Sequence, residues 1–294
     1  MTAPLSEPWV DVFEVARPRL LGLAYRMLGT LDDAEDIVQE AFLRWLSADH
    51  DAIVNPDAWL TTVASRLALD RLRAQQRRRE DYVGPWVAEP LVLEPGPEET
   101  AVRTESLTLG FLALLDRLAP VERAVFLLAD VFGVPFAEIA ETVGRSPAAC
   151  RQIASRARSR VRSAAPRFAA SPDRRVVEEF LVAVALGDID AVLARLSPEA
   201  VCVSDGGANK RAARRPVVGA DRVARFFVNL ARRYGAEASF ASATINGCAG
   251  LIVSMGGGIE LAAAFEVADG RVRSIWVVRN PDKLVHLVDA VPIS

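Results

Sequence analysis

The residues best suited to chemistry in this sequence are arginines that gather on one stretch near its middle. From Arg145 to Arg167 the chain carries seven arginines and no acidic residue. Positive charge on one side of a helix suits the phosphate backbone of nucleic acid, and arginine also reads base edges in the major groove. The outward positions that we expect to contact bases or phosphates are Arg145, Arg151, Gln152, Ser155, Arg156 and Arg158. A solvated basic helix in a bundle is the alternative interpretation.

The residues around these arginines predict a helix-turn-helix from Pro135 to Arg162. The first helix has an apolar face made of Ala137, Ile139, Ala140 and Val143, and the second has an apolar seam made of Cys150, Ile153, Ala154, Ala157 and Val161. Between them, Gly144 can take the left-handed conformation that ends a helix. Ser146 can cap the next helix through its hydroxyl, and Pro147 suits a first helical position.

A second set of reactive residues lies in the last third of the chain. Asp205, Glu260 and His286 are the residues that would supply an acid or a base if this part were an enzyme. No nucleophile motif or histidine–carboxylate pair accompanies them, and a histidine in an apolar tail is more often packed than catalytic. We therefore expect no enzymatic activity and no cofactor.

Composition narrows the class of protein further. The 294 residues suffice for two or three domains, and the net charge of −3 hides a local clustering of basic residues. The three cysteines form no C-x-x-C pair and the chain has two histidines, so we expect neither a metal site nor a disulfide framework. No basic, apolar leader and no membrane-spanning stretch is visible, which predicts a cytoplasmic protein.

The first 80 residues have a helical pattern throughout and predict a bundle of three or four helices. The helix that begins at Asp32 buries Ala34, Ile37, Val38, Ala41, Phe42 and Trp45 in this pattern. Its other face carries Asp33, Asp36 and Glu40, three and four residues apart. Such a face is either ordinary solvated surface or a docking surface for a basic partner.

The next predicted helix begins after the polar loop SADHDAIVNPD, which ends at Asp57, and it gains positive charge toward its end. Arg66, Arg71 and Arg73 could lie along a phosphate backbone, with Asp70 as one of few acids nearby. Trp59, at the start of the helix, could stack on an unpaired base, although a lone tryptophan at such a position is more often part of the core.

A Pro-rich linker over 81–103 separates this bundle from a second helical domain over 104–168. Its apolar residues, such as Tyr82, Trp86 and Val87, predict that part of the linker packs against a domain. From Asp173 to the end, amphipathic helices are followed by a meander of strands with NG, GGG and DG turns. We expect an α+β domain there, with a curved antiparallel sheet wrapped on helices.

The two helical domains resemble a bacterial sigma factor of the extracytoplasmic-function type over about residues 9 to 168. The residues that carry the likeness are DDAEDIVQEAFLRWL, WLTTVASRLALDRLR and PFAEIAETVGRSPAACRQIASRAR. The resemblance implies that the first segment, through Asp33, Asp36, Gln39, Glu40 and Trp45, grips the β′ clamp helices of RNA polymerase. It implies that the second, with Asn55, Trp59, Arg66, Asp70, Arg71 and Arg73, reads the −10 element, although most members carry Asn where Arg66 stands. The third would read the −35 element, and the β flap is the further polymerase contact.

The final third, 173–294, is similar to a SnoaL-like domain, a cone-shaped α+β fold that one group of these sigma factors carries. The likeness rests on three segments: Trp86, Glu89, Pro90 and Leu91 in the linker; Asp205, Gly206, Gly207 and Lys210; and the run Asn280, Pro281, Asp282, Lys283 and Leu284. It implies a sigma factor that selects promoters and is regulated in cis by its last domain, with a small molecule in the cone pocket as a further expectation. The alternatives are a helix-turn-helix regulator that acts without polymerase and a ligand-sensing or enzymatic last domain.

Overall fold

The computed structural model describes residues 8–79, 82–92, 107–164 and 173–287. Its contacts divide the chain into two compact units. The first consists of Met1–Glu80 with Leu115–Val161, and the second of Asp81–Leu114 with Arg162–Ser294. The first unit thus holds most of both predicted helical domains, while the linker belongs to the same unit as the last third of the chain.

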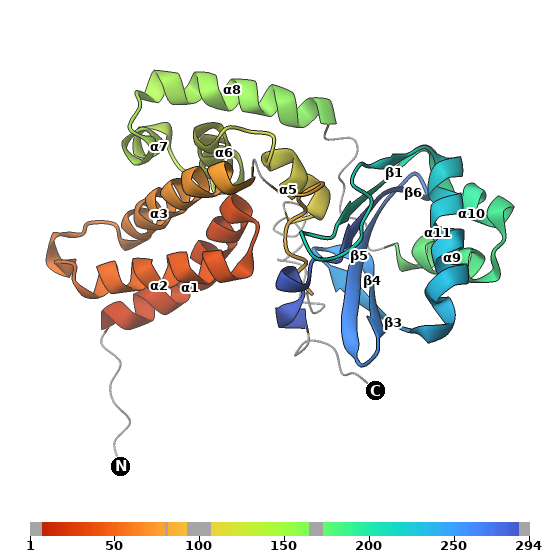
Figure 1. Cartoon of the computed structure of the whole chain (residues 1–294). Helices are drawn as coiled ribbons and strands as arrows, with labels where there is room; N and C mark the ends of the chain where they lie inside the picture. The colour runs from red at the N-terminus through yellow and green to blue at the C-terminus, as the bar shows by residue number, and fades with distance from the viewer. Residues whose placement is uncertain (1–7, 80–81, 93–106, 165–172, 288–294) are drawn as a thin grey trace, which may run out of the picture. The chain divides into compact units, whose positions relative to one another are not determined.

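The first unit begins with three helices, α1 (Pro8–Leu28), α2 (Leu31–Leu46) and α3 (Pro56–Arg79), which Figure 1 shows in red to orange. A short turn of 3-10 helix, η1 (His50–Ala52), lies between α2 and α3. The helices enclose a core in which Phe13, Leu20, Trp45 and Leu60 are at most 2% exposed. The predicted buried side of α2 is confirmed at every position except Phe42, which is half-buried.

The helices that follow the linker end in the helix-turn-helix. They are α5 (Leu109–Leu115), α6 (Pro120–Phe126), the π-helical turn η3 (Leu127–Val131), α7 (Phe136–Val143) and α8 (Pro147–Ala164). All of α5 except its last residue, Leu115, belongs to the second unit, as do the residues of α8 after Val161, and the rest of these helices belongs to the first unit.

The second unit is built on one six-stranded sheet with the strand order β2-β1-β6-β5-β4-β3. Its strands are β1 (Leu196–Asp205), β2 (Val217–Val218), β3 (Ala238–Ile245), β4 (Cys248–Met255), β5 (Gly258–Ala268) and β6 (Arg271–Val278). The helices are α9 (Arg174–Leu186), α10 (Ile189–Arg195) and α11 (Ala220–Tyr234), with the short turns η5 (Gly235–Glu237), η6 (Pro281–Lys283) and η7 (Val285–Leu287).

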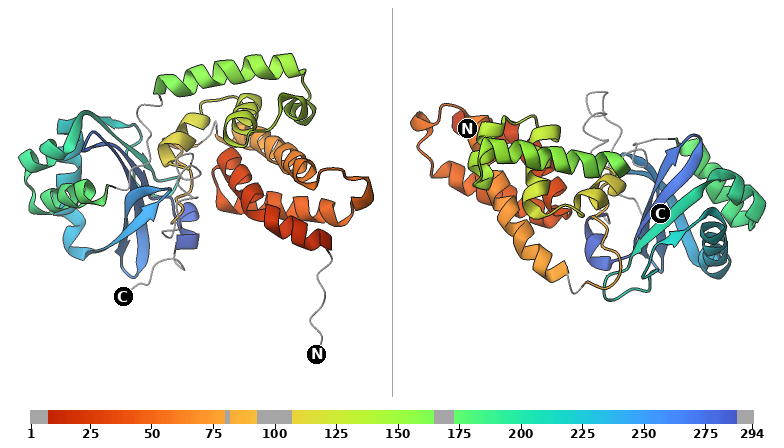
Figure 2. Two further views of the ribbon diagram at one scale, coloured as in Figure 1. Left: turned by 180° about the vertical axis from the view of Figure 1, so that it is seen from behind. Right: turned by 90° about the horizontal axis from the view of Figure 1, so that it is seen from above.

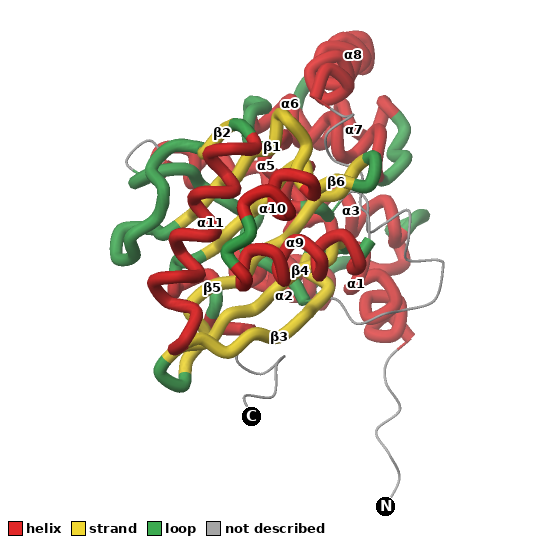
Figure 3. Tube along the Cα trace, turned by 90° about the vertical axis from the view of Figure 1, so that its right-hand side faces the viewer, coloured by secondary structure: helices red, strands yellow, loops and turns green. Residues whose placement is uncertain are grey.

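Helices α9, α10 and α11 cover one face of this sheet (Figure 3), and the two views in Figure 2 agree. The space between helices and sheet is filled by apolar side chains. The ring of Phe180 lies 5.6 Å from that of Phe227 and 5.9 Å from that of Phe265. The described part of the linker, residues 82–92, and the turns η6 and η7 lie on the opposite face of the sheet (Figure 1).

The sheet is mixed, whereas an antiparallel sheet was expected. Strands β3 to β6 form the predicted antiparallel meander, but β1 pairs with β6 in parallel, with Cys202 opposite Ile275. The reason is the connection through α11, which carries the chain from the β2 edge to the opposite edge of the sheet. The meander then returns toward β1, and its last strand runs in the same direction as β1.

Candidate nucleic-acid interface and linker-binding site

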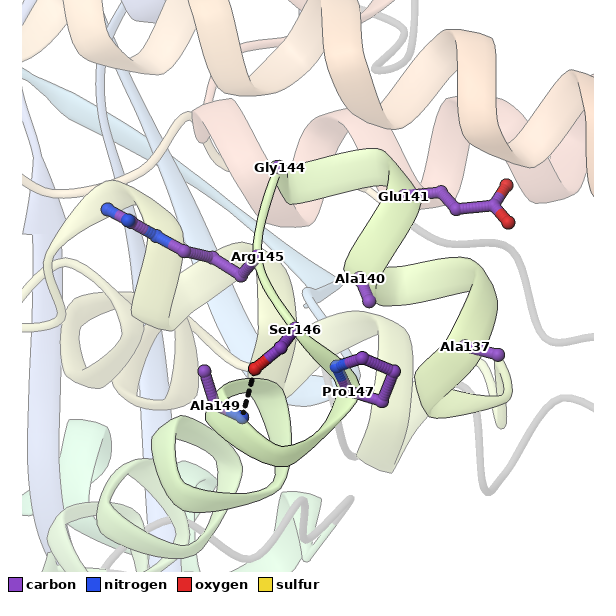
Figure 4. A pocket seen from close by; sticks show the side chains of 8 residues that line it. All are labelled: Ala137, Ala140, Glu141, Gly144, Arg145, Ser146, Pro147 and Ala149. Carbon is purple, nitrogen blue, oxygen red and sulfur yellow. Dashed lines mark hydrogen bonds between the residues drawn. The ribbon is translucent and has the colours of Figure 1, made fainter.

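The helix-turn-helix has the geometry that its residue types predict. Gly144 ends α7 with φ 68° and ψ 45°, a left-handed conformation that glycine adopts without strain. The Ser146 hydroxyl accepts a hydrogen bond from the Ala149 amide at 3.2 Å and so caps α8 (Figure 4). Ala137 is exposed and Thr142 is buried in its place, so this detail of the predicted apolar face is wrong.

The predicted −35 residues form an exposed face on α8 and the turn before it. Arg145, Arg151, Gln152, Ser155 and Arg156 are all exposed. Arg158 differs, because its Nε lies 2.6 Å from the Asp130 carboxylate. Arg151 lies over the Phe136 ring, 5.7 Å from its centroid, and Gly144 to Pro147 border an open hollow between α7 and α8 (Figure 4). The charge available to a phosphate therefore comes mainly from Arg145, Arg151 and Arg156.

The predicted −10 residues are spread along α3 and the turn before it. Asn55 is exposed, and its side chain caps α3 by accepting from the Ala58 amide at 3.1 Å. Trp59 is half-buried, 5.4 Å from the Trp45 ring, and lines a hollow together with Ala48, Asp49, Ala52, Ile53, Val54 and Asn55. One side of the tryptophan packs on the core and another borders an open hollow, so its stacking on a base stays a prediction. Asp70 and Arg73 form an exposed ion pair at 3.0 Å.

The acidic face of α2 is in part neutralised within the same unit. Arg71 Nη1 lies 3.2 Å from Asp33 and its Nη2 lies 3.0 Å from Asp36, so one arginine of α3 bridges two acids of α2. Gln39 is exposed, and Glu40 pairs with Arg44 at 3.2 Å. Trp45 is 2% exposed and donates to the Trp9 carbonyl, so its contribution to this face would be indirect.

Arginines also join the first three helices to the helices that follow the linker. Arg66 on α3 donates to the carbonyl of Glu141 on α7 at 2.9 Å. Arg123 on α6 is 1% exposed and donates to the carbonyl of Arg26 near the end of α1 at 3.1 Å. The Arg26 guanidinium also contacts the helices after the linker, because it lies over the Phe132 ring, 5.7 Å from its centroid. The two helical regions are therefore packed on each other in this conformation.

In the second unit, the Asp205 carboxylate is the centre of the linker-binding site. Asp205 is completely buried, and its two oxygens accept from the Tyr82 hydroxyl at 2.6 Å and the Val87 amide at 2.9 Å. The Gly207 amide donates to it at 3.0 Å and Lys283 Nζ at 2.7 Å. Burial, and then the hydrogen bond to Asp205, raise the pKa of Tyr82 above its usual range.

Lys283 also binds the linker, in addition to its ion pair with Asp205. Its ammonium also donates to the Val87 carbonyl at 2.5 Å and lies over the Trp86 ring, 4.1 Å from the centroid. Only 7% of the Lys283 side chain is exposed. The linker backbone at Val87 is thus bound at both its amide and its carbonyl, and the Trp86 ring packs on the Lys283 ammonium.

Two glycines make room for this arrangement. A Cβ atom on Gly206 would lie 2.4 Å from the Lys210 carbonyl oxygen, and one on Gly207, where φ is 58°, would lie 2.8 Å from the Asn280 side chain. Asn280 in turn donates to the Tyr82 hydroxyl at 3.0 Å and caps η6 by accepting from the Asp282 amide. Leu284 is buried, whereas Pro281 and Asp282 are exposed. The structure therefore brings the predicted residues of all three segments together.

The rest of the described linker is held by His286 and by Asn246. His286 Nδ1 lies 2.6 Å from the Glu89 carboxylate, and Nε2 lies 2.8 Å from the Pro90 carbonyl. The Asn246 backbone amide donates to the Leu91 carbonyl at 2.8 Å, while its side-chain oxygen accepts from the Leu91 amide at 2.8 Å. Val87 and Ala88 are completely buried, which confirms that part of the linker packs on a domain. Leu93 lies outside the described residues.

The candidate acids and bases of the alternative enzyme interpretation are all engaged in this site or beside it. Asp205 and His286 hold the linker, and Glu260 pairs with Lys210 at 2.7 Å and with Arg279. Burial by itself would raise the pKa of Glu260, but hydrogen bonds from Lys210 and Arg279 lower it overall. Within the described residues, no group of three or more histidines, cysteines or acids is placed to hold a metal ion.

Two residues of this site were missed from the sequence. Asn246 looked like an ordinary turn residue in an NG pair, and its φ of 49° agrees with that, but its side chain is completely buried. Glu266 on β5 is 1% exposed and accepts from the Gly110 amide at 3.1 Å. An acid that follows five apolar residues in the run LAAAFEV was the one available signal for Glu266.

The two helical regions and their DNA-binding geometry define the class of protein. Residues 12–78 match the family model of Sigma-70 region 2, and residues 109–161 match that of Sigma-70 region 4. The chain belongs to the ECF RNA polymerase sigma factors.

Individual relatives share most of the architecture. The chain is 42% identical over 289 residues to the ECF RNA polymerase sigma factor SigJ of Mycobacterium tuberculosis, which covers 93% of this chain and 92% of the relative. It is 38% identical over 229 residues to the probable sigma factor SigI of the same species, covering 75% and 74% of the two chains. The crystal structure of M. tuberculosis SigJ superposes with a TM-score of 0.76 at 38% identity, over 97% of this chain and 100% of that one. The likeness to the SigJ structure includes the C-terminal α+β domain. Within the described residues, no helix is both long and apolar enough to cross a membrane.

Proposed function

We propose that this chain binds RNA polymerase core and directs initiation at promoters whose −35 element is read by α8. The observation that supports this most directly is the exposed face of Arg145, Arg151, Gln152, Ser155 and Arg156 on a correctly capped helix-turn-helix. A good bidentate contact from one such arginine to a base discriminates by about 1–3 kcal/mol. Arg158 has a smaller role, because it is already paired with Asp130.

At the −10 element, α3 and the hollow beside Trp59 would take unpaired bases of the opened strand. The exposed side of Asn55 and the half-buried ring of Trp59 border the same hollow, which supports stacking or hydrogen bonding of a base there. Arg66 and Arg73 would contact the backbone once Arg66 leaves Glu141. The exposed side of α2, with Asp36, Gln39 and Glu40, would dock on the β′ clamp helices, while the second helical region would meet the β flap.

The C-terminal domain would regulate this activity in cis by holding the linker and thereby the two helical regions. In the present conformation Arg66 and Arg123 pack the two regions on each other. The −10 and −35 elements lie about 25 base pairs apart, which is about 85 Å of DNA. The regions must therefore separate before both elements can be read. We propose the domain boundaries 1–80, 81–103, 104–168 and 173–294 for these functional parts.

Transcription with purified core polymerase tests the first part of the proposal. The full-length chain should initiate from promoters in a genomic fragment library, and Arg151→Ala with Arg156→Ala should abolish the selection. Arg175→Ala with Arg222→Ala, two exposed arginines of the C-terminal domain, is the matched control and should leave it intact. Failure of the unaltered chain to start transcription at any promoter would overturn the assignment.

Truncation tests the regulatory part. A chain that ends before Asn280 loses the contacts of Lys283 and His286 with the linker, and a chain that ends before Asp173 loses the whole domain. We expect promoter output to change in both and to differ between them. Equal output from both truncations and the full chain would exclude regulation in cis.

Two alternative functions would give different observations. A helix-turn-helix regulator that works without polymerase would bind an operator tightly as free protein, which a gel shift would detect. A small-molecule ligand in the C-terminal domain would need space between helices and sheet, where Phe180, Phe227 and Phe265 now pack.

A further inference from the structure

The loop between β1 and β2, residues 206–216, carries a cluster of positive charge in the C-terminal domain. Lys210, Arg211, Arg214 and Arg215 are exposed, and no acidic residue occurs in the sequence between positions 206 and 219. Lys210 is paired with Glu260, whereas none of the three arginines is in an ion pair with a described acid. We call Arg211, Arg214 and Arg215 the loop arginines.

The backbone that carries the loop arginines is fixed by its own contacts. The Lys210 amide donates to the Gly206 carbonyl at 3.1 Å, and the Arg279 guanidinium donates to the Arg211 carbonyl. A Cβ atom on Gly206 would lie 2.8 Å from the Ala212 Cβ, so the loop folds closely over its own start. Exposed side chains on a fixed backbone can bind a partner without the cost of ordering a loop.

The acids near the loop do not neutralise the loop arginines. Glu260 pairs with two cations, Lys210 and Arg279, so this group keeps one positive charge. Asp282, which is exposed on η6, offsets that charge at most. The buried ion pair of the linker-binding site is neutral in itself. Among the described residues, the loop arginines therefore remain as positive charge without compensation.

We propose that the loop arginines bind the phosphate backbone of promoter DNA beside the −10 element. The C-terminal domain would then contact DNA as well as hold the linker. This inference rests on the proposed function for the place of the contact and goes beyond it in giving the C-terminal domain a nucleic-acid partner.

The position of the loop relative to the linker supports a contact near the −10 element. A Cβ atom on Gly84 of the linker would lie 3.8 Å from the Arg214 Cα, so the linker passes directly beside the loop. Gly84 is five residues beyond the end of α3 at Arg79, and five residues span at most about 18 Å. While the linker is bound, the loop thus stays within about 25 Å of the end of α3, or about seven base pairs of duplex DNA.

The chemistry of the loop favours nucleic acid over a protein surface. Between its charged residues the loop has only Ala212 and Ala213, so it offers no large apolar side chain for the buried centre of a protein interface. Arginine binds phosphate through charge-assisted hydrogen bonds, often two at once. An acidic surface of RNA polymerase is the competing partner, which the experiment below separates from DNA.

The salt dependence of promoter binding by the holoenzyme tests the proposal, measured by fluorescence anisotropy with the full-length chain. Replacement of all three loop arginines by alanine should make the log–log slope less steep by about three, at about 0.9 for each phosphate contact. The choice of promoter should not change, because phosphate contacts carry no sequence information. The corresponding lysine variant keeps the charges and should retain most of the slope.

Arg175→Ala with Arg232→Ala and Arg233→Ala is the matched control. These arginines are exposed on α9 and at the far end of α11, and their loss should leave the slope unchanged. An equal slope for the loop variant and the unaltered chain would overturn the proposal. Weaker binding of the loop variant to core polymerase without DNA, together with an unchanged slope, would assign the loop to polymerase and overturn it as well.

Directed cleavage of the DNA tests the place of the contact. Asn209→Cys puts a thiol on the exposed part of the loop, and the three native cysteines are buried. An iron–EDTA group on residue 209 should cleave promoter DNA close to the −10 element in the holoenzyme, whereas the same group on Asn229→Cys, on α11, should not. Cleavage near the −35 element alone, or no cleavage, would contradict the proposed place.

Failure of the proposed function gives a different result from failure of this inference. If the unaltered chain with core polymerase selects no promoter, the proposed function is wrong. The loop is then judged on the free chain with a duplex of random sequence, where the same loss of slope is expected from the alanine variant and not from its control. An unchanged slope there would overturn the DNA contact too.

Discussion

Lys283 and Asp205 form a buried ion pair, with 2.7 Å between Nζ and Oδ2, and the linker is bound around it. Each partner also binds Val87, so the pair joins the tail, the end of β1 and the linker. Removal of one partner leaves a buried charge without compensation, which costs about 3–5 kcal/mol in comparable proteins.

Lys283→Met should therefore lower the free energy of unfolding of the C-terminal domain by several kcal/mol, measured by urea denaturation. Asp205→Asn should lower it similarly, and the double variant should lose less than the sum of the two single losses. Additive losses would mean that the two charges do not stabilise each other. Arg225→Met, in an exposed pair with Asp221, is the control and should have little effect.

Glu266 should make the stability of the C-terminal domain depend on pH. Burial raises the pKa of Glu266 to about 7, with hydrogen bonds from Trp276 and others opposing it. Because the folded state prefers the protonated acid, the stabilising contribution is complete below the ordinary pKa of 4.5 and is lost as the pH rises through about 7.

The free energy of unfolding should fall by about 1.4 kcal/mol per pH unit between the ordinary pKa and the raised pKa of Glu266. Above the raised pKa, Glu266 should cause no further change. Denaturation curves at several pH values measure this slope. In Glu266→Gln this slope should be absent while the amide oxygen still accepts from Gly110. A slope that persists in this variant would assign the effect to another group.

The arginines of α8 should differ in their contribution to DNA binding. Arg151→Ala and Arg156→Ala should each lower the salt dependence of promoter binding by the holoenzyme by about one counterion, because these side chains are exposed. Arg158→Ala should change it less, since Arg158 is already paired with Asp130 at 2.6 Å. Fluorescence anisotropy over a series of salt concentrations measures the slopes. Equal slopes for all three variants would refute this ranking.

Local patterns were enough to predict the helix-turn-helix and the class of each domain. Gly144, Ser146 and Pro147 act through their own backbone and side-chain preferences, which do not depend on distant parts of the chain. The same holds for the apolar spacing of α2 and for the turns between β3 and β6. The roles of the individual DNA-binding and polymerase-binding residues stay predictions.

Tertiary structure decided which polar residues meet. Arg71 bridges Asp33 and Asp36, and Asn246 joins Leu91 to Leu107, although nothing in the local sequence marks these pairs. The parallel pairing of β1 with β6 likewise depends on the path of α11 across the sheet. Such contacts follow from long-range packing, because a buried polar group must find a partner wherever the fold brings one. The sequence by itself thus determined what each segment is, and the fold decided which segments hold one another.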